Sequence, residues 1–167
     1  MDLDFFSKIL TGDASSIFAD EENILWVDWR QCEDEIVASL SARLGLPELT
    51  CNIEDDSNEH GYRVVITYRE NSITVDPAGE LDTRHATLNA VDELVAPEHE
   101  IRYALDTEGG DSIGIAAGSV FDWQTLLNLH GTSVDERFCP VRQLPDLLQT
   151  PPNQIRSACK AYADRNG

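Results

Sequence analysis

The chain of 167 residues has few basic side chains. Its 12 Lys and Arg stand against 31 Asp and Glu, which gives a net charge of −19 and an isoelectric point near 4.3. A protein that binds nucleic acid neutralises phosphates with clustered Lys and Arg, and this sequence has no such basic cluster. The same charge opposes docking on an anionic membrane surface. The composition therefore excludes a nucleic-acid-binding protein and predicts no membrane partner.

Long apolar runs are missing as well. A membrane-spanning helix requires about 18 to 20 consecutive apolar residues, and the longest candidates are short segments such as residues 24–27. Residues 1–6 are acidic where a secretory signal is basic, so we expect a cytosolic protein. With 41% apolar residues and this length, the chain is predicted to form one domain over residues 1–167.

Cysteine and histidine are too few and too scattered for a disulfide framework or a metal site. The four cysteines form no C-x-x-C pair and the four histidines form no zinc-binding pair, so we interpret the cysteines as free thiols in the core. The segment Asp56-x-Asn58-x-His60 approximates the start of a calcium-binding EF-hand loop. Thr67, however, occupies the position that needs a bidentate Glu. The sequence accordingly predicts no metal and no cofactor.

Motifs for nucleophilic catalysis and for phosphate binding are also absent. Gly118-Ser119 lacks the frame of a nucleophile elbow. The glycine pair Gly109-Gly110 stands between two acidic residues that would repel a phosphate. We therefore predict a non-catalytic protein. A metal-dependent enzyme whose acids hold a divalent ion remains an alternative.

The apolar pattern predicts helices mixed with antiparallel strands. Helical spacing is strongest over residues 30–44 and 83–95, and a C-terminal helix is expected within residues 151–167. A tight hairpin is expected at Glu70-Asn71. These patterns indicate a single α+β domain with a mostly antiparallel sheet and helices packed on one face. The expected strands cover residues 24–29, 49–53, 62–69, 72–75, 101–105, 113–117 and 137–141.

The acidity is uneven along the chain. Residues 1–61 carry a net charge of −12 and residues 62–122 one of −8, whereas residues 123–167 carry +1. Ten of the 12 basic residues are Arg, which favours bidentate pairing with carboxylates. A single acidic run is usually only a solvated loop, but here residues 20–22, 54–59 and 106–111 form three. A negative field of this size raises the association rate with a basic partner.

Two acidic loops and a tryptophan are the candidate binding residues. Trp29 ends a predicted strand and faces away from Trp26. It is an interface anchor if that face is exposed, and a core residue if the strand is buried on both faces. The sequence leaves both alternatives open. The candidate partner-binding residues are Asp55, Asp56, Glu59, Asp106, Glu108, Asp111 and Trp29.

One segment resembles a known family. Residues 100–131 contain the turn Glu108-Gly-Gly-Asp-Ser and the run Trp123-Gln-Thr-Leu-Leu-Asn-Leu-His-Gly. This segment, in a small acidic α+β chain, resembles bacterial immunity proteins, the antitoxins of polymorphic and contact-dependent toxin systems. The resemblance implies stoichiometric binding that neutralises a cognate toxin with a basic surface. If the toxin is a nuclease, the acidic loops would stand in for phosphates.

Type III secretion chaperones provide a second resemblance. They are similar in size and acidity, and in an order of helix, three strands, helix, two strands and helix that residues 36–130 follow. That resemblance implies a dimer that holds an unfolded effector segment. The extra strand at residues 24–29 and the segment after Gly131 depart from the order. Immunity is therefore the first interpretation and the chaperone is the alternative.

Overall fold

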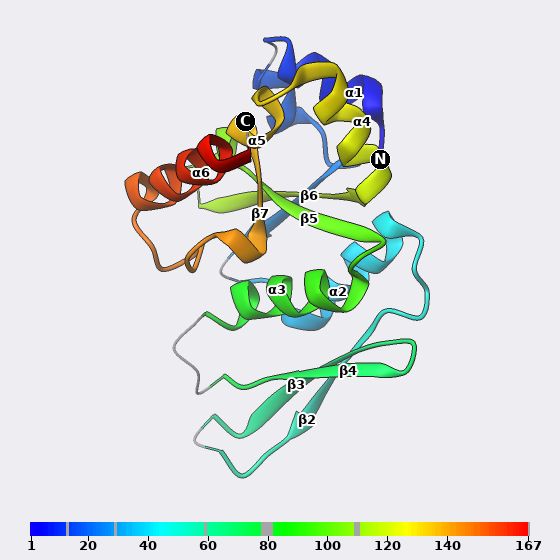
Figure 1. The fold of residues 1–167 in the computed structure, drawn as a ribbon. Helices are drawn as coiled ribbons and strands as arrows, with labels where there is room; N and C mark the ends of the chain where they lie inside the picture. Colours follow the sequence, from blue (N-terminus) through cyan, green and yellow to red (C-terminus); the bar gives the residue numbers. More distant parts are fainter. Residues whose placement is uncertain (13, 29, 59, 78–81, 109–110, 167) are drawn as a thin grey trace.

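The computed structural model describes residues 1–12, 14–28, 30–58, 60–77, 82–108 and 111–166 (Figure 1). Its helices are α1 (Leu3–Leu10), α2 (Glu33–Leu44), α3 (Thr83–Val95), α4 (Val120–His130), α5 (Ser133–Arg137) and α6 (Pro152–Asn166). Three short 3-10 helices cover Ala14–Ala19, Leu105–Thr107 and Val141–Gln143. Its strands are β1 (Ile24–Asp28), β2 (Thr50–Asp55), β3 (Tyr62–Tyr68), β4 (Asn71–Val75), β5 (His99–Ala104), β6 (Ser112–Ser119) and β7 (Phe138–Pro140).

The strands form two antiparallel sheets within a single α+β domain. One sheet has the order β1-β6-β5-β7 and the other the order β2-β3-β4. Helices α2 and α3 contact strands of both sheets, and Figure 1 shows them between the larger sheet above and the smaller sheet below. The predicted α+β class and antiparallel pairing are confirmed. The strands form two sheets where one was expected.

Each sheet is covered differently. The three-stranded sheet carries helices on one face, as expected, and its other face presents polar side chains such as Asn52, Arg63 and Thr74. The four-stranded sheet is covered on both faces. One face joins the apolar core around α2 and α3. The other face packs under α1 and α4, where the rings of Phe6 and Trp123 lie 5.8 Å apart.

Local sequence signals explain where α2 begins and ends and where the β3–β4 hairpin turns. The backbone N–H of Cys32 donates to the Glu35 carboxylate at the start of α2, and Gly45 ends the helix with a φ of 67°. A residue without a Cβ adopts this left-handed conformation at little cost. The β3–β4 hairpin turns at Arg69-Glu70, one residue earlier than predicted, because Tyr68 pairs with Asn71.

The cysteines divide into two groups. Cys139 and Cys159 are buried, as predicted for thiols that fill the core. Cys32 is exposed and Cys51 is half-buried, so the prediction was wrong for Cys32 and only partly met by Cys51. Over the described ranges, no helix combines the length and the apolar character needed to cross a membrane.

Candidate functional site

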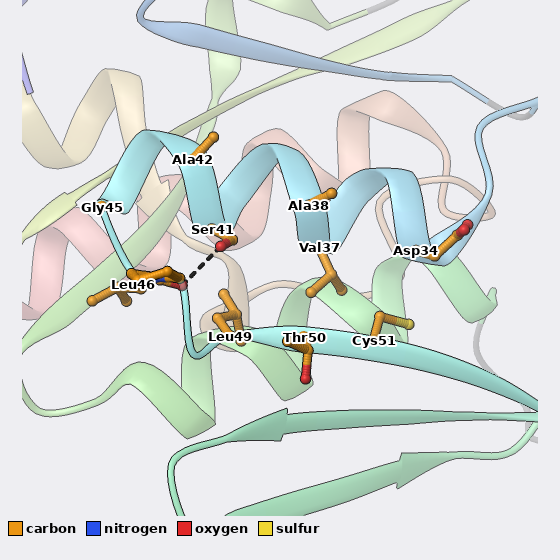
Figure 2. Close-up of a pocket in the computed structure, with 11 residues that line it drawn as sticks. Asp34, Val37, Ala38, Ser41, Ala42, Gly45, Leu46, Leu49, Thr50 and Cys51 are labelled. Carbon is orange, nitrogen blue, oxygen red and sulfur yellow. Dashed lines mark hydrogen bonds between the residues drawn. The ribbon is translucent and has the colours of Figure 1, made fainter.

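An open groove of about 590 Å³ runs between α2 and β2 (Figure 2). Its volume falls in the range of about 300–1,000 Å³ that is typical of binding pockets. The buried side chains of Val37 and Leu49 form its floor, together with half-buried Leu46 and Cys51. Asp34 stands at the end of the groove where α2 begins (Figure 2). The groove therefore combines an apolar floor with a charged end.

The rim of the groove on α2 is made of small side chains. Ala38 and Ala42 follow Asp34 at intervals of four residues, which places the three on one face of the helix. Ala38 and Ala42 are exposed. Ser41 Oγ donates a hydrogen bond of 2.7 Å to the carbonyl of Leu46, which holds the α2–β2 connection against the end of the helix. Because the rim is small, no long side chain fills the space beside β2.

The groove has a negative field. The pKa of the Cys51 thiol is raised to about 11 by burial and then by the nearby carboxylates of Asp34 and Glu33. Asp34 is exposed and makes no ion pair with any described residue. The same is true of Asp55, the last residue of β2. The floor of the groove is therefore exposed to carboxylates that the protein itself does not neutralise.

The first predicted acidic loop lies at the end of β2. Asp55 is exposed, whereas half-buried Asp56 lies 3.8 Å from the Arg63 guanidinium and accepts the backbone N–H of Asn58. Glu59 lies outside the described residues. Of the two described candidates in this loop, Asp55 is therefore the one without an ion pair.

The second acidic loop is largely used inside the protein. Asp106 lies 3.1 Å from Arg137, and Glu108 pairs with Arg156 of α6. The Glu108 side chain is only 5% exposed. Asp111 is exposed, and the described residues supply it with no ion pair.

The structure does not unite the two loops in one site. The 54–59 loop belongs to the three-stranded sheet, at its free end in Figure 1, while residues 105–112 connect β5 and β6 of the four-stranded sheet. Trp29 also lies outside the described residues. Its neighbour Trp26 is half-buried and stacks on Phe18, with ring centroids 5.8 Å apart.

The buried titratable groups outside the groove have structural partners. His85 Nδ1 accepts the Leu147 N–H at 3.4 Å, and burial lowers the pKa of this imidazole. Burial raises the pKa of Asp92 to about 6, although its carboxylate accepts the Ile101 N–H at 2.6 Å and pairs with Arg142. Within the described ranges, no group of three or more His, Cys, Asp or Glu is placed to hold a metal.

Comparison with known proteins adds no relative. No family model matches the chain, and neither a curated protein nor a solved structure matches it. The groove and its charges are therefore the features of the protein that bear on function.

Sequence reasoning missed most of the groove. The signal for its rim was present as the four-residue spacing of Asp34, Ala38 and Ala42, which leaves one side of α2 without long side chains. The signal for its floor was weaker. Nothing in residues 49–55 shows that this strand lies at a sheet edge, because edge position is decided by pairing with distant strands.

Proposed function

We propose that the protein is a non-catalytic binding protein that uses the α2–β2 groove to hold a basic protein partner, and that it neutralises a cognate bacterial toxin as immunity proteins do. The observation that carries the proposal is the apolar groove bordered by acids with no internal counter-ion. Asp34 lies at one end of the groove, and Asp55 lies at the end of β2, four residues beyond Cys51, which lines the groove.

The chemistry of the groove suits a protein surface. Stable interfaces place apolar anchors in a desolvated centre and charged groups at the rim. Half-buried Leu46 and Cys51, with exposed Ala38 and Ala42, supply the apolar surface of such a centre, and the acids supply the rim. A net charge of −19 steers a basic partner toward the protein and keeps copies of the protein apart. The groove therefore supports recognition of a partner that carries both an apolar anchor and positive charge.

A secretion-type chaperone is the second candidate because the order of elements favours it. From Glu33 to His130 the chain follows the order helix, three strands, helix, two strands and helix that the second resemblance implies. A chaperone would be a dimer bound to an unfolded segment of a secreted protein. An immunity protein would be bound one-to-one to a folded domain whose toxicity it suppresses.

The test begins with tagged protein used as bait in its own host at low salt, followed by a rising salt gradient. We expect one basic polypeptide bound at one-to-one stoichiometry and released by salt. Co-expression with that polypeptide should then restore growth of cells that it otherwise kills. A bound polypeptide that is not toxic, or whose toxicity persists on co-expression, contradicts the immunity proposal. A secreted protein held by a dimer would establish the chaperone instead.

A further inference from the structure

We propose that the partner binds by strand addition: an extended, basic segment pairs with the free edge of β2 and lies in the groove beside α2. This inference rests on the proposed function, because it takes the partner to be a basic protein. It adds the mode of binding, the edge that is used and the pattern of side chains that the segment must carry.

The backbone of β2 has an open hydrogen-bonding edge. In the described structure β2 pairs only with β3. The Asp56 N–H donates to the Gly61 carbonyl at 3.0 Å, and bonded and non-bonded pairs alternate along an antiparallel ladder. Counting back from that pair, residues 54, 52 and 50 bond to β3. Residues 51, 53 and 55 therefore direct their N–H and C=O groups toward the open side.

The β3–β4 hairpin gives the same assignment independently. Tyr68 and Asn71 flank a two-residue turn, so they form a bonded pair. The even-numbered residues of β3 therefore bond to β4, which leaves residues 63, 65 and 67 to bond to β2. Their partners across the ladder are residues 54, 52 and 50. Both routes leave three donors and three acceptors unpaired on the outer edge of β2.

The groove leaves room for a strand along this edge. Ala38, Ala42 and Gly45 line the groove without a long side chain; in Figure 2 the methyl groups of Ala38 and Ala42 point away from β2, whereas Val37 points toward it. The groove borders Thr50 and Cys51 at the start of β2, so α2 would cover the first part of an added strand, and the rest would extend along the exposed edge beyond the groove. A new strand at the usual spacing of about 4.8 Å would lie in this trench.

The side chains along the trench determine what the segment must carry. Cys51 and Ile53, two residues apart, lie on the face of β2 that carries the helices; Cys51 lines the groove, whereas Ile53 lies outside its lining and is 44% exposed. These positions favour small apolar side chains at every second residue of the partner. Asp55 lies on the same face of β2 as Cys51 and Ile53, and Asp34 lies above that face at the start of α2, so these acids favour a Lys or Arg at the end of the segment that reaches them. The side chains between the apolar ones point to the opposite face, where positive charge acts through the long-range field. A second copy of this chain would instead bring these carboxylates against their own kind.

The first test uses the synthetic peptide acetyl-Lys-Val-Lys-Val-Lys-Val-Lys-amide, with binding measured by calorimetry. In a strand, valine N–H groups lie on one edge and lysine N–H groups on the other. Methylating the amide nitrogens of one alternate set should abolish binding. Methylating the other set should leave affinity within about threefold, because that edge faces solvent. The corresponding Glu-Val peptide should not bind.

The second test uses variants of the protein. Ile53→Pro removes an outward N–H without touching the β2–β3 ladder, since proline is tolerated at such edge positions. We expect affinity for the peptide to fall at least about tenfold, beyond the loss in Ile53→Ala, which keeps the N–H. Thr74→Pro is the matched control on the outer edge of β4. It should bind as the parent protein does, and circular dichroism should show all three variants folded.

The results of these two tests distinguish a failure of strand addition from a failure of the proposed function. Equal effects of the two methylation patterns, or equal binding by Ile53→Pro and Ile53→Ala, overturn strand addition. If the natural basic partner still binds under those results, the proposed function survives without this mode. If neither peptide nor basic partner binds, both fail. Dimerisation of the protein through β2 instead of peptide binding would likewise overturn the proposal.

Discussion

The two halves of the molecule use their acidic residues in different ways. In the half built on the four-stranded sheet, several carboxylates are paired with arginines, and one pair is buried: Asp135 and Arg102 lie 2.7 Å apart. In the half built on the three-stranded sheet, Asp34 and Asp55 have no ion pair among the residues described. Total charge is therefore a poor guide to binding, and the charge left uncompensated after folding is the better one.

The pairing also explains the uneven charge along the sequence. The C-terminal segment that carries +1 supplies Arg137, Arg142 and Arg156, which pair with Asp106, Asp92 and Glu108. These acids belong to the middle segment of net charge −8. Folding thus neutralises part of the middle of the chain with its end. The first 61 residues retain most of their negative charge.

The largest loss of stability should come from breaking the buried ion pair between Arg102 and Asp135. Arg102 and Asp135 are almost fully buried, and Arg102 also stacks 4.7 Å above the Trp123 ring. Arg102→Met leaves the Asp135 carboxylate buried without its cation, so we expect a loss of about 3–5 kcal/mol in the free energy of unfolding. Urea denaturation measures it. The double variant with Asp135→Asn should recover part of the loss, and no recovery would show that lost packing is the cause.

Truncating a side chain in the floor of the groove should cause a smaller loss in the free energy of unfolding. Leu49 is 2% exposed and packs into the core that α2 and α3 share with both sheets. Leu49→Ala should cost about 2–4 kcal/mol, because it leaves a cavity in that core. Thermal and urea unfolding both report the change. Stability within experimental error of the parent would contradict the packing of Leu49 in that core.

Acid pH should weaken the helix that both halves share. Burial lowers the pKa of His85 in α3, although the carboxylates of Asp146 and Asp82 oppose the shift. The neutral form is thus favoured in the folded protein, and its stabilisation is present above the ordinary pKa of about 6.5. It is lost as the pH falls below that value, because the unfolded chain then binds the proton more readily.

The variant His85→Gln isolates this contribution. Urea unfolding measured between pH 7.5 and 5 should show a shallower decline in the variant than in the parent protein. A decline of the same slope in both would contradict the assignment and place the acid sensitivity on other groups.

The smallest effect is expected for an exposed pair on the three-stranded sheet. Arg63 lies 2.7 Å from Glu54, and the two side chains are 46% and 35% exposed. Arg63→Met should leave the free energy of unfolding close to that of the parent protein, since water and salt screen such pairs. The difference between the stability losses of Arg102→Met and Arg63→Met therefore measures how differently the two halves use their ion pairs. Similar losses in the two variants would remove the distinction between the halves.

Much of the fold follows from local sequence patterns. The helix expected at residues 83–95 is α3 as observed, because apolar spacing and the Asp82 cap act within a few residues. The alternation of Val64, Ile66 and Tyr68 correctly identified the buried face of β3. The short helix α5 and the 3-10 helix at Ala14–Ala19 were not predicted, since they are too short for a clear period.

The features that depend on distant contacts were not predictable. Arg102 alternates with apolar residues as an exposed strand position would, yet it is buried because α4 covers the second face of the sheet. The division into two sheets also depends on which strands pair across the chain. So does the open edge of β2. The candidate acids could be named from the sequence, but their arginine partners could not.

The most direct measurement compares the association rate of the Lys-Val peptide with two variants of equal charge change. Asp34→Lys with Asp55→Lys reverses the groove acids, while Glu136→Lys with Asp164→Lys reverses exposed acids of α5 and α6. We predict that the groove variant slows association by at least about tenfold and the control by less than about threefold. Equal slowing by the two variants would show that net charge alone steers the partner, and would contradict the groove as the binding site.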